Sequence, residues 1–182
     1  MDNKKEKVAI IFDGSNFYHI LKNKNVGIQV TLQYQYRRIA EWLANGREII
    51  SIKYYVGIAR FDKNNPEHSQ RLVSGQQKLF VKLGEQNVEL VRGYMMKNDG
   101  TYHEKGVDVK IAVDMMIGAY ENLYDTVILI SSDTDLIPAV EKVIKLKKKV
   151  EYVGLSYRPS FGLMKKVSET KLLTKNDLDK FQ

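Results

Sequence analysis

The sequence predicts an α/β protein: a three-layer α/β/α sandwich around a mostly parallel central sheet. Short apolar runs rich in Val, Ile and Tyr alternate along the chain with longer stretches of helical period. Several of these runs are apolar at every position, which is typical of strands buried between two layers of helices. The length of 182 residues fits one domain.

The predicted strands are short and end at polar or glycine residues. They cover residues 8–12, 48–56, 87–94, 126–131 and 150–153. Residues 97–106 include Asp99-Gly100 and predict a loop or hairpin.

The predicted helices lie between these strands. They cover residues 15–23, 31–43, 66–83, 107–120, 134–147 and 161–167. Thr31 is a plausible N-cap, and Pro66 and Gly84 mark the ends of the third helix. Pro138 is tolerated only in the first turn of its helix. The helix over 107–120 is apolar nearly all round, which predicts that it is buried.

We expect residues 1–155 to form the main domain and residues 156–182 to be a short C-terminal helical extension of it. The last ten residues predict a short helix or tail, and this segment could pair subunits into a homo-oligomer.

The composition excludes several classes of protein. With no cysteine, the chain has no disulfide scaffold, no thiolate-bound zinc or iron–sulfur cluster and no thiol nucleophile. Its three histidines argue against a His-rich metal site. No apolar run approaches the ~18 residues of a membrane span, and the charged N-terminus is unlike a signal peptide. These features predict a cytoplasmic protein without a membrane partner.

The formal net charge is +7 and is unevenly distributed. It is +3 over residues 1–46, −2 over 47–136 and +6 over 137–182. A basic balance favours anionic partners such as nucleic acid.

Acidic residues follow two of the predicted strands. Asp13 ends the first, while Asp133 and Asp135 follow residues 126–131, and Asp108 begins a helix. Each has a local alternative, since Asp108 and Asp133 could cap helices and Asp13-Gly14 could be an ordinary turn. Ligand sites of parallel sheets lie at the carboxyl edge, where these acids would converge. Clustered carboxylates repel one another unless a cation lies between them, and oxygen ligands favour Mg²⁺ or Mn²⁺.

Two further polar residues stand beside these acids. Asn16 could orient Asp13, bind a phosphate or base, or bond its own backbone. Asp114 lies among apolar residues of its helix, roughly 120° around the axis from Asp108, so we expect a structural role for it.

Three segments, in order, resemble the motifs of NYN domains, and more closely the LabA-like branch of the PIN-like nuclease superfamily. They are residues 10–16 (IIFDGSN), 105–114 (KGVDVKIAVD) and 130–136 (ISSDTDL). The resemblance covers roughly residues 6–155. It implies a PIN-like parallel sheet, ribonuclease activity and an acidic pocket that binds Mg²⁺ or Mn²⁺. Matched motif to motif, the catalytic and metal-binding acids would be Asp13, Asp108, Asp133 and Asp135.

The third motif reads Ser131-Ser132-Asp133 where Ser-Gly-Asp is usual, which reduces the backbone freedom of the turn. Structural or supporting roles at the site are expected for Asp114, Ser131, Ser132 and Thr134.

The sequence therefore predicts a metal-dependent ribonuclease in which bound metal activates water. The alternative is a non-catalytic RNA-binding or regulatory protein that uses the same pocket. A phosphatase of the haloacid dehalogenase type is disfavoured, because Ser15 stands where its second aspartate is needed.

Basic residues outside the acidic motifs are candidates for phosphate contacts, with single-stranded RNA favoured and DNA an alternative. Besides Asn16, the candidate substrate-binding residues are Arg37, Arg38, Lys147, Lys148 and Arg158. Lys147 to Lys149 could equally be a solvated helix end. Four aromatic residues could stack on bases, namely Tyr34, Tyr36, Tyr157 and Phe161.

Overall fold

The computed structural model describes residues 5–22, 34–59, 61–98 and 101–182, with only the backbone of 94–98 and 101–105. Its sheet has the strand order β4-β3-β2-β1-β5-β6-β7. The strands are β1 (Lys7–Asp13), β2 (Glu48–Gly57), β3 (Glu89–Asn98), β4 (Thr101–Lys105), β5 (Thr126–Ile130), β6 (Lys149–Leu155) and β7 (Glu169–Leu173). All neighbours pair in parallel except β3 and β4, which form an antiparallel hairpin.

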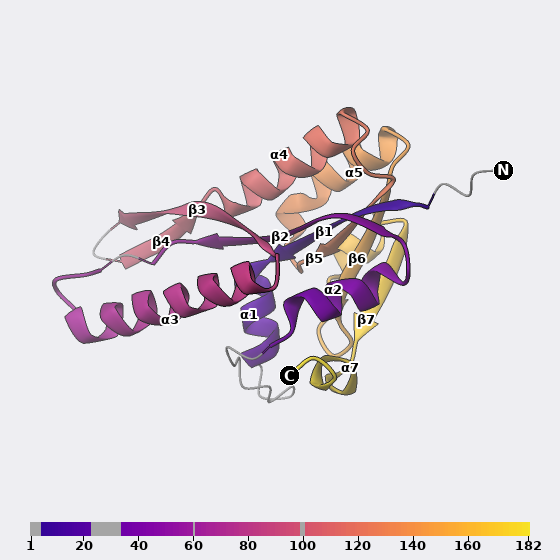
Figure 1. Cartoon of the computed structure of the whole chain (residues 1–182). Coiled ribbons are helices and arrows are strands. Elements are labelled where there is room, and N and C mark those ends of the chain that lie inside the picture. The colour runs from indigo at the N-terminus through magenta and orange to yellow at the C-terminus, as the bar shows by residue number, and fades with distance from the viewer. Residues whose placement is uncertain (1–4, 23–33, 60, 99–100) are drawn as a thin grey trace.

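Helices cover both faces of this sheet (Figure 1). One layer contains α1 (Gly14–Lys22), α2 (Tyr36–Ala44), α3 (Pro66–Glu85) and α7 (Lys175–Asp179). The other contains α4 (Val107–Tyr120), α5 (Ile137–Lys145) and α6 (Phe161–Met164). The three-layer α/β/α sandwich predicted from the sequence is therefore confirmed.

The side chains of β1 point alternately to the two faces of the sheet and so contribute to two hydrophobic cores. Val8, Ile10 and Phe12 pack into the layer of α1 and α2, whereas Ala9 and Ile11 pack against α4 and α5. Asp13 follows in the second series, so its side chain lies on the α4 side at the carboxyl end of the strand.

The C-terminal segment differs from the prediction of helices alone. It contains β7, which pairs with β6 and forms one edge of the sheet. Residues 156–182 thus complete the sheet and also supply Leu178 and Phe181 to the core. The first three residues of β7, Glu169 to Lys171, are polar and exposed on this edge strand, so no continuous apolar run marks it in the sequence.

Several element boundaries also differ from the predictions. The expected helix over 134–147 begins as a 3₁₀ turn, η1 (Thr134–Leu136), before α5. The described part of the expected helix over 31–43 begins at Tyr36, and Thr31 lies outside the described residues. Tyr34 and Tyr36 are fully buried in an aromatic cluster with Phe17, so they are core residues and not base-stacking surfaces.

The expectation that α4 is buried all round is wrong for its outer face. Its inner side packs on the sheet through Ile111 and Met115, but Val109 and Tyr120 are exposed. Within the described ranges, no helix is long and apolar enough to cross a membrane.

Candidate functional site

Asp13 ends β1, near the middle of the sheet, and is only 5% exposed. Two side chains donate hydrogen bonds to its Oδ2: the Asn16 amide at 2.7 Å and the Ser131 hydroxyl at 2.7 Å. The Asn16 backbone N–H donates to Oδ1 at 3.1 Å. Asn16 therefore orients Asp13, and residues from β1, α1 and the end of β5 meet at this carboxylate.

The protonation of Asp13 reflects its burial. Desolvation raises the pKa of the Asp13 carboxyl above its usual value, and the charge of nearby Asp133 raises it further. The hydrogen bonds from Ser131 and Asn16 oppose this rise. The charged form of Asp13 is thus held at a site that would favour a compensating cation.

Asp133 caps a helix turn, as considered from the sequence, and also lies close to Asp13. Its Oδ1 accepts a hydrogen bond from the Asp135 backbone N–H at 2.9 Å, so Asp133 caps η1. Its own N–H donates to the Ser131 hydroxyl at 3.1 Å. Ser131 thereby links Asp13 and Asp133, and the Asp133 charge is close enough to affect Asp13.

The side chains of Asp135 and Asp108 lie at the same edge of the sheet but outside this network. Asp135 is exposed in η1. Asp108 lies in the first turn of α4, three residues after Lys105, the last residue of β4. Lys105 pairs with Tyr94, which follows the carboxyl end of the β2–β3 ladder. Among the described residues, no three His, Asp or Glu side chains are placed to hold one metal ion. The geometry therefore brings together Asp13 and Asp133, with the other two acids at the rim.

Asp114 joins α4 to β2 through two side chains. Its Oδ2 accepts a hydrogen bond from the Tyr55 hydroxyl at 2.6 Å and forms an ion pair with Lys53 Nζ at 2.9 Å. Burial pushes the pKa of Asp114 upward, but the bonds from Tyr55 and Lys53 outweigh it and hold the pKa below its usual value. The expected structural role fits these contacts, in which both partners are side chains of β2.

Lys53 and Tyr55 were missed by the sequence reasoning. Tyr55 is the strand partner of Asp13, so the Asp114 cluster lies one strand away from the acidic site. A lysine two residues before a tyrosine in a strand is a weak signal, because nothing in the sequence of β2 indicates which helix faces these two side chains.

The basic residues predicted to contact phosphate are divided between the two ends of the sheet. Arg158 is exposed in the turn after β6, at the carboxyl edge, where its N–H bonds the Leu155 carbonyl. Lys147 and Lys148 lie before β6, at the opposite edge. The structure therefore does not bring these two lysines to Asp13.

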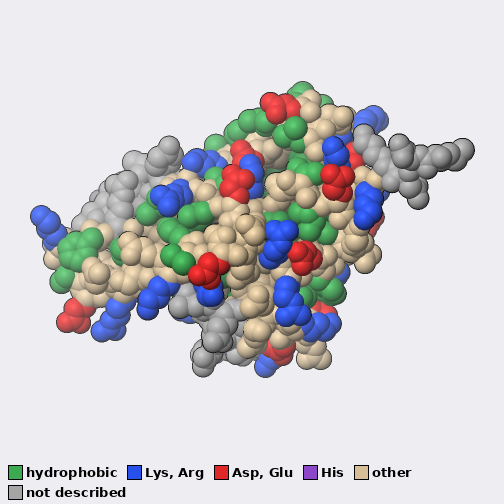
Figure 2. All heavy atoms as spheres, viewed as in Figure 1, with side chains coloured by type: hydrophobic (Ala, Val, Ile, Leu, Met, Phe, Trp, Pro, Cys, Tyr) green, Lys and Arg blue, Asp and Glu red, His purple; other side chains and the backbone are tan. Residues whose placement is uncertain are grey.

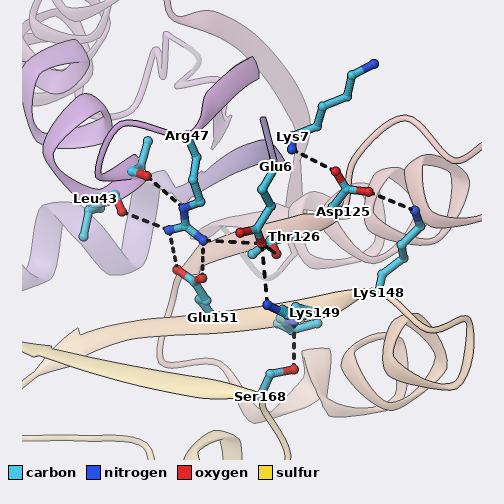
Figure 3. Close-up of polar contacts among 12 residues, drawn as sticks. Glu6, Lys7, Leu43, Arg47, Asp125, Thr126, Lys148, Lys149, Glu151 and Ser168 are labelled. Atoms are coloured by element: carbon cyan, nitrogen blue, oxygen red, sulfur yellow. Dashed lines mark hydrogen bonds and ion pairs between the residues drawn. The ribbon is translucent and has the colours of Figure 1, made fainter. Parts of the chain in front are cut away.

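The Lys148 side chain already has partners at the amino edge, and Figure 3 shows its contact with Asp125. It contacts the Asn122 side chain and lies 3.8 Å from Asp125. Arg47 forms a bidentate pair with Glu151 nearby. This end of the molecule is held together by ion pairs.

Arg37 and Arg38 lie in the first turn of α2, in the helical layer opposite to α4. Arg37 pairs with Glu41 at 2.9 Å, and Arg38 is exposed. The side chain of Asp13 extends to the other face, so these arginines do not line its carboxylate.

Helix α6 lies beside η1. A Cβ on Gly162 would lie 3.1 Å from Cγ2 of Thr134, so α6 packs closely on η1. Phe161 at the start of α6 is 68% exposed, and Tyr157 in the turn after β6 is 39% exposed. The segment from β6 to α6, which carries Tyr157, Arg158 and Phe161, therefore leads from the carboxyl edge of the sheet to the acidic turn.

Comparison with known proteins identifies the family. The sequence profile of the NYN domain matches residues 7–170. The chain belongs to the NYN domain family. This match extends through η1 and into β7, so it includes all four predicted acids.

A solved structure supports the fold of this NYN domain. A protein of unknown function from Vibrio parahaemolyticus is 23% identical, with a TM-score of 0.70 over 96% of each chain. A search of curated proteins gave no match.

Proposed function

We propose that this NYN domain is a metal-dependent ribonuclease whose reactive centre is the carboxyl edge around Asp13. The main support is the buried Asp13 carboxylate, which is held by Asn16 and Ser131 beside Asp133. A family in the PIN-like nuclease superfamily favours a nucleic acid substrate. The basic charge of the chain favours the same class of partner.

The residues at this edge fit a hard divalent cation in their chemistry. All the donors are oxygens, and a nearby second carboxylate makes the charged form of Asp13 costly. Asp13 and Asp133 would hold Mg²⁺ or Mn²⁺, with Asp108 and Asp135 available from α4 and η1. Such an ion lowers the pKa of bound water and neutralises charge on the phosphate.

The protein residues would have separate tasks. Asn16 and Ser131 fix the orientation of Asp13, so its oxygens need no rearrangement before substrate binds. Asp133 or Asp135 orients the attacking water. Arg158, Tyr157 and Phe161, which are exposed between β6 and the start of α6, would bind the phosphate and bases of a single strand.

The second candidate is a non-catalytic RNA-binding or regulatory protein. It is favoured by one observation: within the parts of the chain that the structure covers, only two of the four acids share a network, and no three-acid group is formed. Both candidates use the same edge and differ in whether bound RNA is cleaved.

The test is cleavage of a labelled single-stranded RNA with Mg²⁺ or Mn²⁺. Asp13→Asn and Asp133→Asn should each lower the cleavage rate by about 100-fold or more, because each removes charge that holds the cation. Glu67→Gln is the matched control, since Glu67 is 87% exposed on α3 and should leave the rate unchanged.

Metal-dependent cleavage that is lost in both aspartate variants supports the nuclease. Salt-sensitive RNA binding without cleavage by the wild type supports the binding protein instead. Cleavage that survives in an Asp13→Asn/Asp133→Asn double variant contradicts the assigned site.

A further inference from the structure

The outer face of α4 is apolar and exposed over three helical turns. Val109 is 59% exposed, Ile117 46% and Tyr120 60%, and Val113 is also exposed. With a rotation of about 100° per residue, these four positions fall within about 80° of one another around the axis. A solvent-facing helix normally carries charged or polar residues there. We name this stripe, formed by Val109, Val113, Ile117 and Tyr120, the α4 face.

The apolar surface continues beyond the helix. A shallow pocket of about 90 Å³ lies between α4 and β2, and Ile117, Leu123 and Ile50 line it. Ile50 lies where the β1–β2 register skips a residue, and this bulge leaves its side chain exposed. Figure 2 shows hydrophobic side chains gathered along the upper edge of the view, over α4. Contiguous apolar patches of this kind mark protein interfaces.

We propose that the α4 face is the interface of a two-fold homodimer in which α4 packs antiparallel against α4 of a second copy. The four positions are spaced almost symmetrically about Met115. Antiparallel pairing about that point places Val113 against Ile117 of the partner subunit and Val109 against Tyr120 of the partner subunit. Such a self-complementary arrangement is what a two-fold interface requires.

The charges beside the stripe favour the same pairing. Lys110 and Glu121 lie on one flank of α4, at its two ends, about 20° apart around the axis. The Lys110 ammonium is held on that flank by its hydrogen bond to the Arg92 carbonyl at 2.6 Å. In the antiparallel pair, Lys110 lies near Glu121 of the partner subunit, whereas a parallel two-fold pair would place these two side chains on opposite flanks.

On the opposite flank, Lys142 of α5 lies 5.3 Å from the centre of the Tyr120 ring. This contact holds the Tyr120 ring at the end of the α4 face, and the charged Lys142 gives that side of the face a polar rim. The acidic edge at Asp13 is not part of the α4 face, so the dimer does not depend on nuclease activity.

The experiment is sedimentation of the full chain over a range of concentrations. The wild type should give a species of twice the 21.0 kDa mass of one chain. Val113→Glu should raise the dimer dissociation constant about 30-fold or more, because a carboxylate would be buried at the centre of the interface. Val81→Glu is the matched control, since Val81 is 61% exposed on α3 in the other layer. It should leave the dimer intact.

Charge variants test the direction of pairing without placing a charge in the apolar centre. Glu121→Lys should weaken the dimer about 2- to 5-fold, and Lys110→Glu added to it should restore affinity. A wild-type chain that is monomeric at every concentration overturns the proposal. Equal effects of Val113→Glu and Val81→Glu on the dissociation constant also overturn it. So does a failure of the Glu121→Lys/Lys110→Glu double variant to regain affinity, provided that circular dichroism shows the single and double charge variants to be folded.

Discussion

At the scale of single residues, Ser131 connects the two acids of the candidate site. It is fully buried, donates to Asp13 and accepts from the Asp133 N–H. Ser131→Ala would leave the Asp133 N–H without this acceptor and remove a donor from a buried carboxylate. We expect a loss of about 1–3 kcal/mol in the free energy of unfolding, measured by urea denaturation.

Ser132→Ala is the control for this substitution, since the neighbouring Ser132 is only half-buried. It should change the free energy of unfolding by no more than about 0.5 kcal/mol. Equal losses in the two variants would show that Ser131 does not hold Asp13 and Asp133 together.

Because Asp114 forms an ion pair, we expect the stability of the fold to depend on pH. Its pKa is lower in the folded chain than its usual value, so its charge stabilises the fold above about pH 4. This contribution is lost as the pH falls through the folded pKa. Asp114→Asn keeps an acceptor for Tyr55 but removes the charge, so it should destabilise the protein at pH 7 and have progressively less effect below about pH 4.

Thermal melting from pH 3 to 7 measures this difference, with Asp179→Asn on α7 as a surface control. A stability difference between Asp114→Asn and wild type that stays constant across this range would contradict the role of the Lys53 pair.

The sequence predicts a site residue well when its contact partner is near in the sequence, and poorly when the partner is distant. Asp13 and Asn16 are three residues apart in one motif, and their contact follows from a strand-to-helix turn. Lys53 and Tyr55 reach Asp114 from a strand about sixty residues earlier, and the sequence carries no register for that contact. The separation of the four acids also depends on side-chain placement, which strand order alone does not determine.

At the scale of elements, the start of α1 lies against β2 with no room for a side chain. A Cβ on Gly14 would lie 2.5 Å from the Tyr55 carbonyl oxygen and would also meet the Tyr54 ring. Because the Tyr55 carbonyl oxygen is a backbone atom, β2 cannot move away from this Cβ without loss of strand pairing. We expect Gly14→Ala to lower the free energy of unfolding by about 1–3 kcal/mol or more.

Gly75→Ala is the matched control in α3, where a Cβ would meet nothing within 4 Å. That change should stabilise the chain by about 0.5–1 kcal/mol, since alanine favours a helix. Chemical denaturation of both variants tests the pair, and a Gly14→Ala chain as stable as wild type would contradict the close packing of α1 on β2.

The elements that the sequence predicted well are those with a clear period. The fully buried strands β1 and β5 have continuous apolar runs, and their bounds match the prediction closely. The edge strand β7 was missed because its first three residues are polar and exposed, and only Leu172 and Leu173 pack against the cores. The extent of α4 was predicted correctly, but its composition indicated burial where the structure exposes a face.

At the scale of the whole molecule, the basic charge is divided between the two ends of the sheet. Arg158 lies at the edge that carries Asp13, whereas Lys147 and Lys148 lie at the other edge among ion pairs. We therefore expect Arg158→Ala to weaken binding of single-stranded RNA and to reduce the dependence of affinity on salt by about one phosphate contact.

The Lys147→Ala/Lys148→Ala double variant is the counterpart at the amino edge. It removes more positive charge, yet it should change RNA affinity less than Arg158→Ala does. Fluorescence anisotropy over a salt series measures the RNA affinity of both variants. A larger effect of the double variant would show that RNA binds at the amino edge and not beside Asp13.

The proposed function requires Asp13 and Asp133 to bind a divalent cation together at the carboxyl edge of the sheet. The most direct measurement is a crystal structure of the chain grown with Mn²⁺, with the ion located by its anomalous scattering. We expect an ion within ligand distance of the Asp13 and Asp133 carboxylates, and its loss in Asp13→Asn. Mn²⁺ bound only elsewhere, or bound unchanged in Asp13→Asn, would contradict it.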